Sequence, residues 1–120
     1  MPVRCLNSPV FKWPDRTAVD TALRSIAGQF ASAHPELLRL GYFGSYARGD
    51  WGVGSDIDII AIVGASSVSF AERAPTFDVS GLPVQAEMLV YTAAEWSDMQ
   101  REGRRFVRAI EREAVWVFSR

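Results

Sequence analysis

Cysteine and histidine are nearly absent from this chain of 120 residues, in which Cys5 and His34 are the only examples. A lone cysteine excludes an internal disulfide framework and suits a reducing compartment. Zinc clusters of cysteine and histidine are excluded as well. A metal site in this sequence must therefore rest on carboxylates, which favour hard cations such as magnesium. His34 precedes Pro35 at the end of a predicted helix, so we interpret it as a helix-end residue rather than a catalytic base.

Long apolar runs and a strong net charge are also missing. No apolar stretch approaches the length of a membrane span, and polar residues and prolines interrupt the N-terminal region, which excludes a signal peptide. The net charge of -1 shows no overall bias toward nucleic acid or an anionic membrane. We therefore expect a soluble, cytoplasmic protein that has no membrane partner and does not require nucleic acid.

Apolar residues, in contrast, make up 48% of the chain and include four Trp and seven Phe, which excludes a disordered protein. The length fits one domain with a core of its own. We expect an N-terminal arm over residues 1–14, with a short extended piece at 10–11, followed by a single domain over 15–120.

The apolar pattern predicts an α/β domain with a mixed sheet that carries helices mainly on one face. Helices are expected over 15–33 and from Thr92, which opens a capping box with Glu95, to about 113 with a break near Gly103. Strands are expected over 37–43, 56–63 and 84–91, with weaker strands over 75–80 and 115–118 and a helical turn over 45–48.

Two aspartates, Asp56 and Asp58, begin the clearest predicted strand. Side chains at positions i and i+2 of a strand point to the same face, so the two carboxylates project together from Cα atoms roughly 6.5 Å apart. Two like charges side by side are costly unless cations neutralise them. Asp56 could instead cap the preceding loop and Asp58 could pair with an arginine, but the apolar run that follows both favours metal binding.

A third carboxylate would complete such a metal site, and the sequence offers two candidates. Glu87 lies inside the predicted strand 84–91, where an acidic residue needs an explanation. Asp78 lies beside the Ser80-Gly81 turn, where solvent is close. We favour Glu87, with Asp78 as the alternative.

A Gly44-Ser45 turn lies ten residues before Asp56, between a predicted strand and a short helical turn. Glycine lets the backbone approach a phosphate, and the amides at such a turn favour anions. Arg48 could support a triphosphate or could tether the loop through Asp50 or Asp56. Ser55 is interpreted as a loop-shaping residue that could also contact a phosphate.

These residues, Gly44-Ser45-Tyr46-Ala47-Arg48-Gly49, Ser55-Asp56-Ile57-Asp58 and Glu87, resemble the minimal nucleotidyltransferase (MNT) family of the DNA-polymerase-beta-like superfamily. The resemblance covers most of residues 15–118 and implies the nucleotidyltransferase fold. It also implies that Asp56, Asp58 and Glu87 are the catalytic residues that bind two magnesium ions, and that Gly44 and Ser45 hold the triphosphate of ATP. Glutamate stands where aspartate is commoner at the third position.

The resemblance further suggests a partner, because many MNT proteins of this length are antitoxins that add AMP to a tyrosine of a helical HEPN ribonuclease toxin. We therefore expect a protein adenylyltransferase that forms a hetero-oligomer with a HEPN-type toxin. The chain is too short for the additional helical domain with which larger relatives hold the acceptor. Two alternatives remain, an antitoxin that acts by binding only and nucleotidyl transfer to a small molecule such as an aminoglycoside.

Arginines recur along one side of the last predicted helix, within an arc of roughly 100° at 3.6 residues per turn. This side is either a solvated face balanced by neighbouring glutamates or a docking surface for an acidic partner or RNA. The residues concerned are Arg101, Arg104, Arg105, Arg108 and Arg112.

Overall fold

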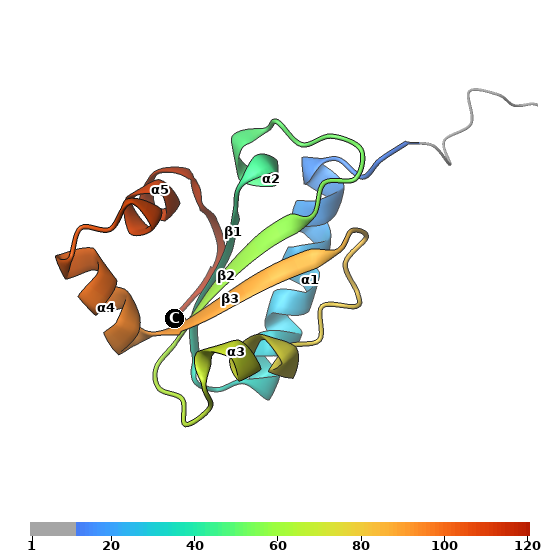
Figure 1. Ribbon diagram of the computed structural model, residues 1–120. Helices are drawn as coiled ribbons and strands as arrows, with labels where there is room; N and C mark the ends of the chain where they lie inside the picture. Colours follow the sequence, from blue (N-terminus) through green and yellow to red (C-terminus); the bar gives the residue numbers. More distant parts are fainter. Residues whose placement is uncertain (1–11) are drawn as a thin grey trace, which may run out of the picture.

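A four-stranded mixed sheet forms the centre of the domain (Figure 1). The computed structural model describes residues 12–120. The strands are β1 (Leu37–Phe43), β2 (Ile57–Val63), β3 (Ala86–Thr92) and β4 (Val115–Ser119), arranged in the order β3-β2-β1-β4. β1 is antiparallel to β2 and β4, whereas β2 and β3 are parallel. The expected mixed sheet of an α/β domain is thus confirmed.

The helices begin where the sequence provides caps. The side chain of Asp15 accepts a hydrogen bond from the Ala18 amide at the start of the first helix, and Thr92 forms the expected capping box with Glu95. Gly103, with φ of 65°, separates the last two helices, as predicted. The helices are α1 (Arg16–Ala33), α2 (Ser45–Arg48), α3 (Phe70–Arg73), α4 (Ala93–Arg101) and α5 (Arg105–Glu113).

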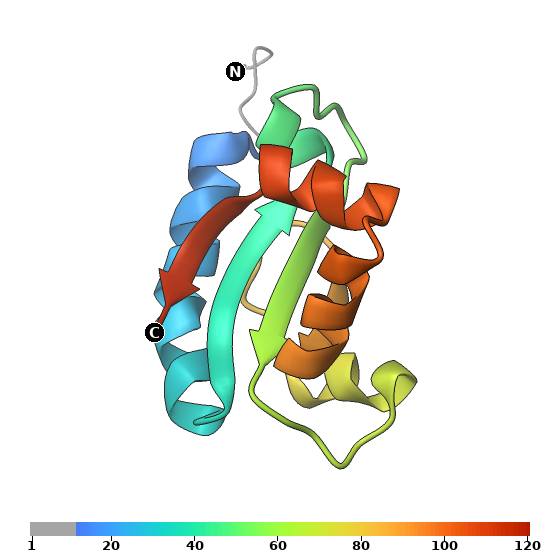
Figure 2. The ribbon, with the colours of Figure 1, turned by 90° about the vertical axis from the view of Figure 1, so that its left-hand side faces the viewer.

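Helices cover both faces of the sheet, which corrects the expectation that they would lie mainly on one. Figure 2 shows α4 and α5 in front of the sheet and α1 behind it. The reason lies in β2, which is buried on both sides: Ile57 and Ile59 join the core under α1, while Ile60 and Ile62 pack with residues of α4 and α5. A strand buried on both faces requires a cover on each of them.

The predicted weak strand over 75–80 is wrong. The chain there forms a 3-10 turn, Ala74–Thr76, directly after α3, and then an irregular segment up to β3. The Thr76 hydroxyl donates a hydrogen bond of 2.6 Å to the Arg73 carbonyl, and Asp78 accepts hydrogen bonds from the amide and hydroxyl of Ser80. These local side-chain bonds stabilise turns, so they outcompete pairing with the sheet.

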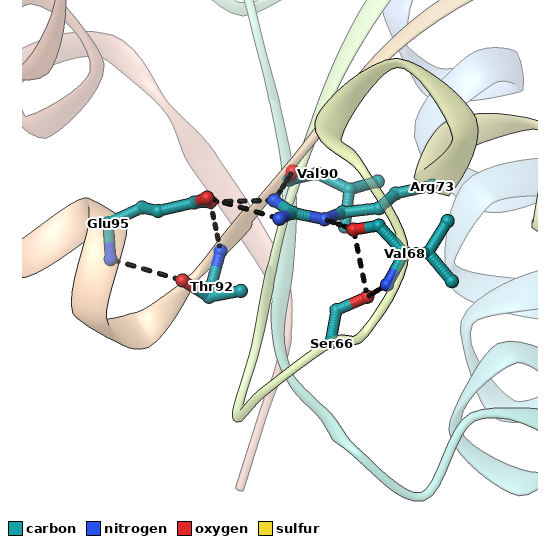
Figure 3. Close-up of polar contacts among 6 residues, drawn as sticks. All are labelled: Ser66, Val68, Arg73, Val90, Thr92 and Glu95. Carbon is teal, nitrogen blue, oxygen red and sulfur yellow. Dashed lines mark hydrogen bonds and ion pairs between the residues drawn. The ribbon is translucent and has the colours of Figure 1, made fainter.

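Arg73 joins the loop after β2 to the end of β3 (Figure 3). This side chain is 9% exposed, and its guanidinium pairs with Glu95 at 2.6 Å. It also donates hydrogen bonds to the carbonyl oxygens of Val68 at 2.9 Å and Val90 at 3.1 Å. Because Glu95 belongs to the capping box of α4, the network holds α3, β3 and α4 together at the end of the sheet opposite the acidic residues.

Within residues 12–120, no helix combines the length and the apolar character that crossing a membrane requires. Most of the expected arm over 1–14, including the extended piece at 10–11 and Cys5, lies outside the described residues.

Candidate active site

The register of the sheet brings the acidic residues together. Asp58 of β2 lies opposite Phe43 of β1 and opposite Glu87 of the parallel strand β3. The pKa of Asp58 is raised, first by burial and then by the negative charges of Glu87 and Asp56. The structure therefore places Asp56, Asp58 and Glu87 within electrostatic reach of one another at the same end of the sheet.

The donor chemistry of this cluster fits a hard divalent cation. In the part of the chain that the structure describes, no three His, Cys, Asp or Glu side chains are gathered closely enough to hold an ion as they stand. The carboxylates stand apart because like charges repel when no cation lies between them. Since Glu87 is exposed, its side chain can turn toward Asp58 without disturbing the core. Asp56, Asp58 and Glu87 would hold the metal through carboxylate oxygens, the ligands that magnesium prefers.

Gly44 has to be glycine for two reasons. Its φ of 76° and ψ of -150° are unfavourable for residues with a side chain. In addition, a Cβ on this residue would collide with the Oδ2 atom of Asp58. The Gly44-Ser45 turn and the Asp58 carboxylate are therefore in direct contact. The sequence suggested this contact only through the spacing of the two motifs.

Buried Tyr46 and two partly buried tryptophans anchor this turn to the N-terminal part of the domain. Tyr46 is fully buried, and its hydroxyl accepts a hydrogen bond from the Trp13 indole and donates one to the Pro14 carbonyl, both at 2.9 Å. Trp51 stacks on the Tyr46 ring with the centroids 5.5 Å apart. The Arg16 guanidinium donates to the Ala47 carbonyl at 3.2 Å. Together these contacts hold α2 and the turn against the start of α1.

Arg48 takes the tethering role, which is one of the two that the sequence left open. Its Nε atom pairs with Asp50 at 3.2 Å, so it tethers the loop, and its Nη1 atom points to Glu113 at 3.3 Å. The same Glu113 oxygen accepts a hydrogen bond of 2.8 Å from the Gly44 amide. Arg48 therefore faces the Gly44-Ser45 turn, where its positive charge can act on an anion.

The remaining candidates take local roles. Ser55 accepts a hydrogen bond of 2.8 Å from the Gly52 amide through its hydroxyl, which closes the loop before β2. Asp78 is exposed and caps its own turn with Ser80, and its charge is not among those that shift the pKa of Asp58. The structure thus places Glu87, and not Asp78, beside the aspartate pair.

Two residues of this site escaped the sequence analysis. Glu113 lies 69 residues from Gly44 along the chain, and no local pattern marks it among the charged residues of α5. Tyr46 is the second, although an aromatic residue directly after a Gly-Ser turn is a signal for an anchor into the core.

The five arginines of the predicted basic side, Arg101, Arg104, Arg105, Arg108 and Arg112, are all exposed. Two of them form local ion pairs, Arg101 with Asp98 and Arg104 with Glu102.

Comparisons with known proteins bear on the family and the fold of the chain. A sequence model described as the nucleotidyltransferase domain matches residues 23–117. Among solved structures, a candidate nucleotidyltransferase from Sulfolobus solfataricus is similar with a TM-score of 0.62 and 21% identity, over 88% of this chain and 84% of that one. A structure described as a toxin-antitoxin with AMP-PNP is similar with a TM-score of 0.53 and 17% identity, over 81% and 73% of the two chains. No curated protein matches the sequence.

Proposed function

Because this chain belongs to the nucleotidyltransferase domain family, we propose that it is a magnesium-dependent enzyme that transfers AMP from ATP to a hydroxyl group of a partner protein. A tyrosine is the proposed acceptor and a HEPN-type toxin the proposed partner, so that the chain acts as an antitoxin. The observation that carries the enzymatic part is the position of Asp58, which lies between the Gly44-Ser45 turn and Glu87.

Each residue of the site has a role in this proposal. Asp56, Asp58 and Glu87 hold the magnesium ions, which when bound supply charge neutralisation and activation of the acceptor hydroxyl. The amides of Gly44 and Ser45 bind the triphosphate, and Arg48 adds a positive charge at the same turn. The acceptor oxygen attacks the α-phosphorus and its proton passes to solvent water, while the bond from the α-phosphorus to the bridging oxygen breaks and pyrophosphate leaves.

The antitoxin role is supported by a structural neighbour and by the resemblance to MNT proteins. One of the similar structures is described as a toxin-antitoxin with AMP-PNP, which is an ATP analogue.

Label transfer from α-labelled ATP to a co-expressed HEPN-type protein tests the proposal. We expect magnesium-dependent labelling that falls at least about a hundredfold in Asp58→Asn and in Glu87→Gln, because each replaces a proposed carboxylate ligand of the magnesium ions by a neutral, weaker one. Asp78→Asn is the matched control and should label like the wild type, since Asp78 caps an exposed turn. Labelling that depends on Asp78 and not on Glu87 would exclude Glu87 as the third ligand.

Asp58→Asn should also be more stable than the wild type in the absence of magnesium. Burial, and after it the neighbouring carboxylates, disfavour the charged form of Asp58, so the neutral amide removes an electrostatic cost of roughly 0.5–1 kcal/mol. Urea denaturation of both proteins measures this gain and shows that lost labelling is not lost folding. If Asp58→Asn still neutralises the toxin in cells, the antitoxin acts by binding and not by catalysis.

A further inference from the structure

The side-chain carboxylate of Glu113, the last residue of α5, lies against the Gly44-Ser45 turn. Its Oε2 atom accepts hydrogen bonds from the Gly44 amide at 2.8 Å and from Arg48 Nη1 at 3.3 Å. Both views of the fold show α5 next to α2, and Figure 2 shows it crossing in front of the end of β1. The two donors that face the proposed phosphate position are therefore engaged by an anion that belongs to the chain itself.

This carboxylate lies in an electrostatically unfavourable place. The charge of Glu113 is one of those that raise the pKa of Asp58, so it adds to the negative cluster of Asp56, Asp58 and Glu87. Among residues 12–120, the Gly44 amide and the half-exposed Arg48 are its hydrogen-bond partners, and the Glu113 side chain itself is 22% exposed. A contact of this kind is strong enough to form and weak enough to be displaced, because partly exposed ion pairs contribute little net free energy.

We propose that Glu113 is an internal competitor of the nucleotide, a carboxylate that occupies the phosphate position of the Gly44-Ser45 turn and leaves when the triphosphate binds. The inference rests on the nucleotide site of the proposed function. The Gly44 amide has one hydrogen, so it cannot bond fully to the carboxylate and to a phosphate oxygen at the same time.

Competition by Glu113 has a defined effect on affinity. When the turn is free only in a fraction of the molecules, the apparent dissociation constant of the nucleotide equals the intrinsic constant divided by that fraction. Nucleotide binding must also release the end of α5 from the turn, and Glu113 is followed after one residue by β4. The site is thereby linked to the helix that carries the exposed Arg105, Arg108 and Arg112.

The test compares Glu113→Gln with wild type in calorimetric titrations with ATP and with inorganic triphosphate, which has no base. We expect Glu113→Gln to bind both ligands roughly three- to tenfold more tightly, because the neutral amide competes less well for the donors. Glu111→Gln is the matched control: it removes the same charge from the same helix at an exposed residue that bonds Gln100, and its affinity should stay within about twofold of wild type.

The amide resonance of Gly44 provides a readout that does not depend on activity or on nucleotide. It should shift in Glu113→Gln and not in Glu111→Gln, because only Glu113 accepts its hydrogen bond. Three results would each overturn the inference while leaving wild-type nucleotide binding intact. The Gly44 resonance could stay unshifted in Glu113→Gln, or Glu113→Gln could bind the ligands no more tightly than wild type. Glu111→Gln could also gain as much ligand affinity as Glu113→Gln. If the resonance shifts but none of the three proteins binds ATP, the proposed nucleotide site itself is refuted and the inference with it.

Discussion

At the scale of single residues, Gly44 shows how tightly the site is built. Its backbone conformation and its contact with the Asp58 carboxylate both require the absence of a side chain. Gly28, in the middle of α1, has no such requirement, because a Cβ there would meet no atom within 4 Å. A side chain is therefore excluded at Gly44 by its surroundings, whereas at Gly28 the choice of residue affects only helix propensity.

Replacing these glycines should have opposite effects on stability. Gly44→Ala is expected to lower the free energy of unfolding by about 2–3 kcal/mol, because the backbone is strained and the new methyl group displaces Asp58. Gly28→Ala should raise it by roughly 0.5–1 kcal/mol, because alanine is the better helix former. Urea denaturation measures both values, and a stable Gly44→Ala protein would contradict the contact with Asp58.

At the scale of the elements, most bounds follow from local signals. The apolar run after Asp58, the Thr92 capping box and the break at Gly103 all predicted elements that the structure contains. The strand expected over 75–80 failed, because β propensity in a short segment cannot be separated from the turn chemistry of Asp78 and its neighbours. The Arg73 network has no local signal at all, since its partners come from three different elements.

Loss of the Arg73 guanidinium should destabilise the domain strongly. Arg73→Met removes the side-chain donor of the Val90 carbonyl, leaves the Val68 carbonyl with the longer 3.5 Å bond from the Ser66 hydroxyl, and breaks the ion pair with Glu95. We expect a cost of about 2–4 kcal/mol in urea denaturation. Arg101→Met, which removes an exposed ion pair with Asp98, serves as the control and should cost at most about 0.5 kcal/mol. Equal costs for the two variants would show that the Arg73 network contributes no special stability.

The partner of Arg73 makes part of this stability depend on pH. The Arg73 guanidinium and the Thr92 amide lower the pKa of Glu95 below its ordinary value of 4.5. The ion pair therefore stabilises the fold fully above that pH, and its contribution is lost as the pH falls through the lowered value. Glu95→Gln should cost about 1 kcal/mol at pH 7, a modest value because Glu95 is 41% exposed. The difference from wild type should shrink below pH 4.5 in acid titrations of stability.

At the scale of the whole molecule, two cores hold helices against opposite faces of one sheet. The larger core under α1 contains Tyr42, whose hydroxyl donates a hydrogen bond of 2.7 Å to Asp20 of that helix. Burial, followed by this bond and the Asp20 charge, raises the pKa of Tyr42 to about 12. The contact joins α1 to the central strand β1 and gives the domain a titrating group in its interior.

Alkaline unfolding should report on this group. Between its ordinary value of 10.0 and about 12, the folded protein keeps the Tyr42 proton while the unfolded chain loses it. Stability therefore falls as the pH rises through that window. In Tyr42→Phe, the slope of the free energy of unfolding against pH in this window should be smaller by up to about 1.4 kcal/mol per pH unit. The free energy of unfolding at pH 7 should drop by about 1 kcal/mol, because the hydrogen bond to Asp20 is lost. Identical slopes for the two proteins would contradict a proton held by buried Tyr42.

The sequence by itself determined the order of most elements, the mixed α/β class and the aspartate pair, because each of these follows from local patterns of apolar, capping and charged residues. The tertiary structure decided that Glu87 rather than Asp78 lies beside Asp58, since the parallel register of β2 and β3 is set by packing across the sheet. It also decided that helices cover both faces and that Glu113 reaches Gly44 across 69 residues of chain. Such long-range contacts depend on how the whole chain packs, and no spacing within the sequence encodes them.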